Sequence, residues 1–177
     1  MIKKNIKTKI KEHFFTNPSA KLRVREIERT LNVPLPSVIR YCAELTKENI
    51  LTTINLGTAK FYAANKTHPN YLLQKKLHNL QKIYESNLIN YIKIQLSNPC
   101  IILFGSYSKG EDMEDSDIDL YLETPSKKNI DLKEFEKTLN RKIQVFKCRK
   151  LKEIPNNHLK NNIINGITIN KYIEVFE

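Results

Sequence analysis

The sequence predicts an α+β protein with two parts, a basic helical module followed by a small α/β unit with a mixed sheet. Apolar residues recur at helical spacing up to residue 49, and two alternating segments follow. Further on, a short apolar run ends at Gly105, and a second apolar run carries Asp117 and Asp119. The chain has 177 residues, 40% of them hydrophobic and 28% charged, which is enough to bury a core.

The composition also narrows the class of protein. No stretch approaches the roughly 18 apolar residues of a membrane span, and the N-terminal residues lack the continuous apolar segment of a signal peptide. Cys42, Cys100 and Cys148 lie far apart and form no metal-binding spacing with histidines. We therefore expect a cytoplasmic protein with reduced thiols and no membrane partner.

Positive charge is concentrated in the first third of the chain. Residues 1–65 hold twelve Lys/Arg and five Asp/Glu, a net charge of +7, whereas residues 66–177 hold eighteen and fourteen, a net charge of +4. A basic surplus favours a polyanionic partner, with nucleic acid the first candidate. A genome bias towards Lys, Asn and Ile would produce the same surplus without a partner.

Three helices are predicted in this basic third. The first spans residues 2–15, where Ile and Phe recur every fourth residue, and Asn17-Pro18-Ser19 ends it. The second carries Val24, Ile27 and Leu31 and stops near Pro34, because proline disfavours helical geometry in the residue before it. The third starts at Pro36 or Ser37. Its apolar stripe comprises Val38, Tyr41, Cys42 and Leu45, and Asn49 can cap its end.

A hairpin follows the third helix. Residues 50–55 and 59–63 alternate as two strands, and Leu56-Gly57 forms the turn between them. This order of elements is that of a winged helix-turn-helix. Residues 5–65 resemble regulators of the ArsR and MarR groups, which implies that the third helix enters the major groove of DNA. By this resemblance the DNA-binding residues are Arg23, Arg25, Ser37, Arg40, Lys47 and Lys60. The alternative is a module for dimerisation or protein contact.

We expect domains at 1–65 and 99–177, with a helical connector at 66–98. His68-Pro69 and Asn98-Pro99 bound the connector, whose apolar residues keep helical spacing with a break near residues 85–87. The connector could brace two domains, pair with its copy in a homodimer, or pack onto the following domain.

The most informative stretch is FGSYSKGEDMEDSDIDLYLE, residues 104–123. Residues 100–104 form a buried strand, and Gly105 lets backbone amides approach a ligand closely. Ser106 adds a hydroxyl. Asp117 and Asp119 lie two residues apart on the next strand, so both point to one face. Two carboxylates on one face repel each other. Mg²⁺ prefers carboxylate oxygens and also binds substrate phosphates, so a bound Mg²⁺ would remove the cost of this repulsion.

A Gly-Ser pair followed after ten residues by Asp-x-Asp resembles the signature of the polymerase-β-type nucleotidyltransferases, most closely the minimal nucleotidyltransferase domains. The resemblance covers about residues 70–177. It implies that Asp117 and Asp119 are catalytic metal ligands and that Gly105 and Ser106 bind the nucleotide. Lys109 is a further candidate for the triphosphate, and the four loop acids between residues 111 and 115 are expected to be solvated.

The family has a third carboxylate on a strand after an intervening helix. We expect that helix at Asp131–Leu139 and the strand at 141–148, which places Gln144 in the position of the third acid. A neutral amide supplies no charge and cannot act as a base. Glu123 and Glu153 are possible substitutes. A helix at Glu153–Asn165, stopped by Gly166, and a last strand at Tyr172–Phe176 complete the expected unit.

The resemblance implies transfer of a nucleoside monophosphate, with ATP and Mg²⁺ as default donor and cofactor, to a hydroxyl. A protein acceptor such as a HEPN-type toxin would make the chain an antitoxin-type enzyme. The alternative, favoured by Gln144 and the basic first third, is a catalytically impaired transcription regulator that senses a nucleotide. Modification of DNA or RNA ends is a third interpretation.

Overall fold

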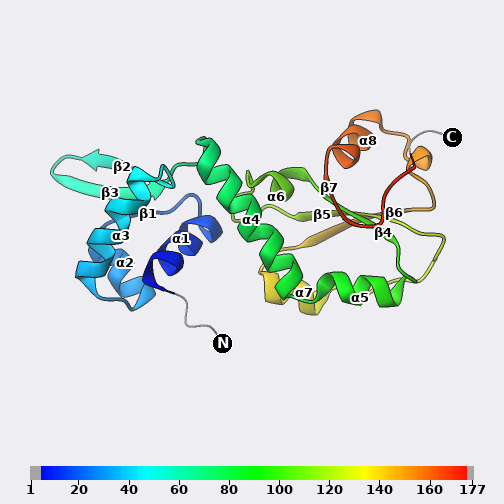
Figure 1. Cartoon of the computed structure of the whole chain (residues 1–177), viewed down its shortest axis with the longest axis horizontal. Coiled ribbons are helices and arrows are strands. Elements are labelled where there is room, and N and C mark those ends of the chain that lie inside the picture. Colours follow the sequence, from blue (N-terminus) through cyan, green and yellow to red (C-terminus); the bar gives the residue numbers. More distant parts are fainter. Residues whose placement is uncertain (1–4, 175–177) are drawn as a thin grey trace. The chain divides into compact units, whose positions relative to one another are not determined.

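The computed structural model describes residues 5–174, and their contacts divide the chain into two compact units, Met1–His78 and Asn79–Glu177. The helix α4, Pro69–Glu85, begins in the first unit and ends in the second (Figure 1). The second unit therefore starts inside the segment predicted as a connector. The reason is that the end of α4 and all of α5 contribute Ile83, Leu88 and Ile92 to its core.

The first unit contains the three predicted helices and the predicted hairpin. Its elements before α4 are α1 Ile6–Thr16, β1 Lys21–Leu22, α2 Val24–Leu31, α3 Leu35–Lys47, β2 Leu51–Leu56 and β3 Ala59–Ala64. Residues 2–4, predicted as part of the first helix, lie outside the described residues. Asn5 is the N-cap of α1, where its side chain accepts a hydrogen bond from the Thr8 amide.

A three-stranded antiparallel sheet in the order β1-β3-β2 packs beside these helices. The two-residue strand β1 has too little sequence to show alternation and was not predicted. Ile10, Phe14, Ile27, Val38 and Leu45 are fully buried in one core. The apolar stripes read from the sequence therefore meet in the interior of this unit, as helical periodicity predicts.

The second unit is a mixed four-stranded sheet with helices on both faces (Figure 1). Its elements after α4 are α5 Leu88–Gln95, β4 Cys100–Phe104, α6 Gly105–Lys109, β5 Ile118–Glu123, α7 Lys133–Leu139, β6 Ile143–Cys148, the 3₁₀ helix η1 Leu151–Glu153, α8 Asn157–Ile164 and β7 Ile167–Asn170. The strand order is β6-β5-β4-β7, and only β5 and β6 run parallel.

The two faces of this sheet have different partners. Ile118, Leu120 and Leu122 lie on the face covered by α5 and α7. Tyr121 and Phe104 lie on the opposite face, with Leu151, Ile154 and Ile163 from the segment that contains η1 and α8. Because side chains alternate along a strand, Asp119 belongs to this second face.

The predicted end of the chain needs a correction. The last strand is β7, which pairs with β4 at Ile167–Asn170, rather than Tyr172–Phe176. Residues 171–174 are not in a strand, and residues 175–176 lie outside the described part. The chain returns to the sheet directly after α8 because Gly166 packs tightly there, where a Cβ atom would lie 2.7 Å from the Leu103 carbonyl oxygen.

Candidate functional site

The centre of the site is the contact between Gly105 and Asp119. Phe104, the last residue of β4, pairs with Asp119 of β5, and the chain turns into α6 at Gly105 with φ at +73°. A Cβ atom on residue 105 would lie 2.2 Å from Asp119 Oδ2. Glycine is therefore required at position 105 for two reasons, the backbone conformation and the space that the Asp119 carboxylate occupies.

Asp117 and Asp119 interact electrostatically. Burial raises the pKa of Asp119 above its ordinary value, and the negative charge of Asp117 raises that pKa further. Asp117 stands one residue before β5, which begins at Ile118, so it is not inside the strand as predicted. Both side chains are partly buried.

This pair of carboxylates fits a hard divalent cation. In the described part of the chain, no three His, Cys, Asp or Glu side chains are grouped to hold a metal ion. Mg²⁺ needs no such group, because it is commonly held by one or two carboxylates together with water and substrate phosphates. A cation here would also offset the repulsion that raises the pKa of Asp119.

Gln144 lies next to Asp119 across the parallel pair. The register of β5 and β6 joins Asp119 to Gln144, so the two side chains belong to the same face of the sheet. Gln144 is exposed, because β6 is an edge strand. The structure thus places the neutral residue beside Asp119, and its role as the third-ligand position stays a prediction.

The two acids named as possible substitutes at the third-ligand position, Glu123 and Glu153, both accept hydrogen bonds within the chain. Glu123 ends β5, four residues or about 13 Å along the strand from Asp119. Its carboxylate accepts hydrogen bonds from the Tyr121 hydroxyl and the Leu151 amide, both at 2.9 Å. Glu153 accepts one from the Arg149 amide at 3.1 Å. Both acids stabilise the segment after β6.

The other nucleotide-binding candidates are on the five-residue helix α6. Ser106 is partly exposed in its first turn, next to Gly105. Ser108 donates a hydrogen bond to the Gly105 carbonyl oxygen at 2.8 Å, which holds the turn closed. Lys109 is exposed at the last position of the helix, so contact with a triphosphate stays a prediction.

The loop acids differ from the expectation in one case. Glu111 and Asp115 are exposed and Glu114 is partly buried, but Asp112 is only 2% exposed. Its carboxylate accepts a hydrogen bond from Asn79, a residue of α4 that is 33 positions away in the sequence. Spacing within the motif contains no signal for this partner.

An open hollow of about 750 Å³ lies beside Asp117. Its walls come from residues 114–117, from Lys133, Glu136 and Lys137 of α7, and from residues 140–142. Gly105, Ser106 and Asp119 do not line it. The hollow therefore adjoins the carboxylate pair through Asp117, and charges of both signs surround it.

The predicted DNA-binding residues lie on several elements of the first unit. Arg23 is the N-cap of α2, with its guanidinium 4.9 Å from the centre of the Phe61 ring, and Arg25 is exposed on α2. Ser37 is in the first turn of α3, and the exposed Lys47 ends that helix. Lys60 of β3 lies over the ring of Tyr62.

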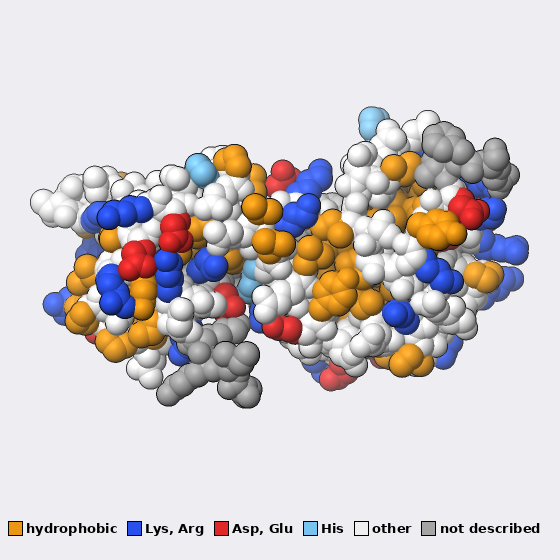
Figure 2. Space-filling model, viewed as in Figure 1, with side chains coloured by type: hydrophobic (Ala, Val, Ile, Leu, Met, Phe, Trp, Pro, Cys, Tyr) orange, Lys and Arg blue, Asp and Glu red, His pale blue; other side chains and the backbone are white. Residues whose placement is uncertain are grey.

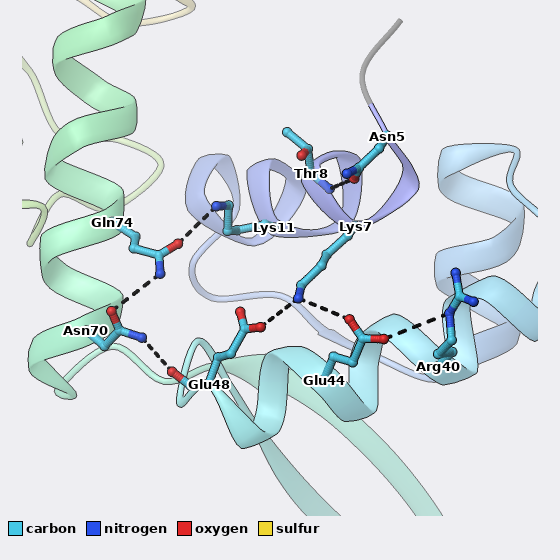
Figure 3. A network of polar contacts seen from close by, with 9 residues as sticks. All are labelled: Asn5, Lys7, Thr8, Lys11, Arg40, Glu44, Glu48, Asn70 and Gln74. Carbon is cyan, nitrogen blue, oxygen red and sulfur yellow. Dashed lines mark hydrogen bonds and ion pairs between the residues drawn. The ribbon is translucent and has the colours of Figure 1, made fainter.

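Arg40 is exposed on α3 but already has partners within the chain (Figure 3). Its Nε is 3.9 Å from Glu44, and its guanidinium lies 4.4 Å from the centre of the Tyr41 ring. Glu44 also binds Lys7 at 3.0 Å, and Lys7 binds Glu48 at 2.6 Å. Any contact between Arg40 and a phosphate would compete with Glu44.

Comparison with known proteins gives one family match, which lies within the second unit. The family model described as Polymerase beta, Nucleotidyltransferase matches residues 86–172. This range contains the Gly105–Asp119 contact, Asp117 and Gln144, and it supports a nucleotidyltransferase-type domain of the kind that the motif predicts. Domains of this type generally use divalent metal ions.

No curated protein matches the chain, and no solved structure does. The family match does not cover the first 85 residues. Within residues 5–174, no helix is long and apolar enough to cross a membrane.

The Gly105–Asp119 contact predicts a large effect of one methyl group. Gly105→Ala should weaken Mn²⁺ binding, used as a spectroscopic substitute for Mg²⁺, by on the order of 10-fold to 100-fold, because the added Cβ pushes the Asp119 carboxylate aside. Gly57→Ala is the matched control. Its φ is also positive, at +59°, but nothing lies within 4 Å of the new Cβ. Equal losses in both variants would contradict the contact as the cause.

The raised pKa of Asp119 predicts a pH dependence of stability. In metal-free protein the folded state binds this proton more tightly than the unfolded state, so Asp119 costs stability as pH rises through its raised pKa. Asp119→Asn should therefore increase the melting temperature at neutral pH. The gain should shrink as pH falls through that pKa, as measured by circular dichroism in a chelator. A gain that is independent of pH would show that the charge is not the cause.

Proposed function

We propose that the second unit transfers a nucleoside monophosphate from a nucleoside triphosphate to a hydroxyl acceptor. The observation that supports this most strongly is the Asp119 carboxylate against Gly105, with the charge of Asp117 beside it. This geometry joins the glycine turn to the carboxylate pair at one end of β4 and β5. A turn that served only the fold would not need a second carboxylate next to Asp119, because the two negative charges repel each other.

The reaction would be an in-line attack of the acceptor oxygen on the α-phosphorus, with pyrophosphate as the leaving group. Asp117 and Asp119 would hold Mg²⁺, which neutralises phosphate charge and lowers the cost of charge in the transition state. Gly105 leaves its backbone open to the phosphates, and Ser106 offers a hydroxyl next to it. ATP is the proposed donor, by resemblance to the family.

Gln144 limits this reaction. A carboxylate at position 144, next to Asp119, would attract a cation by its negative charge and could accept a proton. The amide of Gln144 does neither. We therefore expect nucleotide binding to be retained and transfer to be weak. A nucleotide-sensing regulator is the second candidate function, and it is favoured by the same residue.

The acceptor is proposed to be a protein, with a HEPN-type toxin as the leading example and an antitoxin-type role for the chain. The charged hollow beside Asp117 is large enough to receive part of an acceptor. Nucleic acid ends are the competing acceptor. The lining of the hollow holds both acidic and basic side chains, so its charge does not decide between these two acceptors.

Restoring the missing charge provides the test. Gln144→Asp should increase transfer of label from α-labelled ATP by at least about tenfold at saturating Mg²⁺, because it adds an anionic group next to Asp119. Thr168→Asp is the control, since Thr168 is also exposed on an edge strand of the same sheet. Strong transfer by the wild-type protein that Gln144→Asp leaves unchanged would show that position 144 is not the missing ligand.

We also propose that the first unit is a winged helix-turn-helix that binds duplex DNA, and that the chain acts in transcription regulation. The order of α1, α2 and α3 followed by the β2–β3 hairpin supports this, together with the net charge of +7 in residues 1–65. Acidic side chains are interspersed with the basic ones on the visible face of this unit (Figure 2). Affinity would therefore depend on selected cations such as Arg40 rather than on a uniform patch.

The affinity for DNA should fall steeply as the salt concentration rises. Log affinity should fall with log salt concentration with a slope of about −0.9 for each phosphate contact, measured by fluorescence anisotropy. Arg40→Ala should weaken binding by roughly fivefold or more. Lys9, exposed on α1, is the control. Lys7 is unsuitable because its removal would free Glu44 to hold Arg40. Absence of binding at about 50 mM salt would favour a protein-contact role.

A further inference from the structure

Three buried polar side chains of the second unit contact one another. Asp112 is 2% exposed and Asn79 is 3% exposed, and the Arg141 side chain is 7% exposed. Asn79 Nδ2 donates to Asp112 Oδ1 at 2.7 Å, and Arg141 lies 3.9 Å from Asp112 Oδ2. We call these three residues the Asp112 cluster. Buried charges of this kind persist only when they are paired, so the cluster has a defined arrangement.

The cluster joins three segments that lead into the candidate site. Asp112 lies in the loop between α6 and β5, five residues before Asp117. Arg141 comes two residues before β6, whose second residue is Gln144. Asn79 also donates to the Tyr107 carbonyl oxygen at 2.9 Å, which attaches α6 directly.

The path from Asp112 to Asp117 is short and folded. The loop has no helix or strand, and it is bounded by Gly110, with φ at +77°, and by β5. Inside it the Met113 amide donates to Ser116 Oγ at 2.8 Å, and the Ser116 amide donates to the Met113 carbonyl oxygen at 3.2 Å. With Asp112 anchored on one side of this turn, Asp117 on the other side has little freedom to move.

We propose that Asp112 is a positioning residue that holds Asp117 beside Asp119 through its contacts with Asn79 and Arg141. The proposal rests on the proposed function, because it assigns a part of the metal and nucleotide site. Buried partners that orient ligands typically control metal affinity by about 10-fold to 100-fold. Releasing Asp112 would let the turn adopt several conformations, and the carboxylate pair would lose its fixed separation.

Asp112→Asn is the direct test. It keeps the volume of the side chain and an oxygen that can accept from Asn79, but it removes the charge that faces Arg141. Mn²⁺ affinity, measured by electron paramagnetic resonance, should fall by about 10-fold to 100-fold. Thr124→Val is the matched control, because Thr124 is also buried, at 4% exposed, and donates to the Leu96 carbonyl oxygen away from the site. Its affinity should equal that of the wild type.

A double-mutant cycle separates positioning from general stabilisation. If Asp112 acts through Asp117, then Asp112→Asn should have little further effect in the background of Asp117→Asn. Additive losses in this cycle, or an unchanged Mn²⁺ affinity in Asp112→Asn, would overturn the proposal.

Amide hydrogen exchange tests, without any ligand, whether Asp112 holds the loop before Asp117 in place. Exchange at residues 113–117 should accelerate by about tenfold or more in Asp112→Asn, with β4 and β5 unchanged. If the wild-type protein binds neither Mn²⁺ nor ATP, the proposed function fails, and exchange still tests the anchor. If Asp112→Asn does not fold, Arg141→Gln, which removes the positive charge that faces Asp112 and keeps a polar side chain, takes its place in both measurements. A uniform acceleration across the second unit would show a purely structural role and overturn the proposal.

Discussion

The close approach of the Asp119 carboxylate to the Cα atom of Gly105 is the constraint on which the site depends. It requires an antiparallel β4–β5 pair in one register, in which Phe104 is opposite Asp119. It also requires a residue without a Cβ atom where β4 turns into α6. A shift of that register by one residue would turn Asp119 towards the apolar core around Leu120.

The two faces of the sheet explain how a carboxylate pair can exist here at all. One face is closed by α5 and α7, and alternate residues of β5 bury their side chains against it. The other face is covered near Tyr121 by the segment of η1 and α8, which leaves Asp119 and Gln144 at the end beyond that cover. The same strand therefore contributes core residues and charged site residues. The raised pKa of Asp119 is the electrostatic cost of this arrangement.

The first unit shows how much a regular pattern can reveal. Helical periodicity predicted α1, α2 and α3, and alternation with a glycine turn predicted the β2–β3 hairpin. Periodicity could not predict the ion pairs of Glu44. The pair with Lys7 joins α1 to α3 across 37 residues. The pair with Arg40 lies on an exposed helix face, where many pairings compete. These contacts change the interpretation of Arg40 from a free cation to one that is shared.

In the second unit the sequence alone determined the local chemistry. Gly105, Asp117 and Asp119 were recognisable because strand alternation and the demands of a phosphate turn are properties of neighbouring residues. Only the tertiary structure decided the register that pairs Asp119 with Gln144, the hydrogen bonds of Glu123 and Glu153, and the burial of Asp112 with Asn79 and Arg141. The physical reason is that these contacts join residues from different elements, so their energies depend on where the sheet and helices bring them, and no spacing along the chain records that.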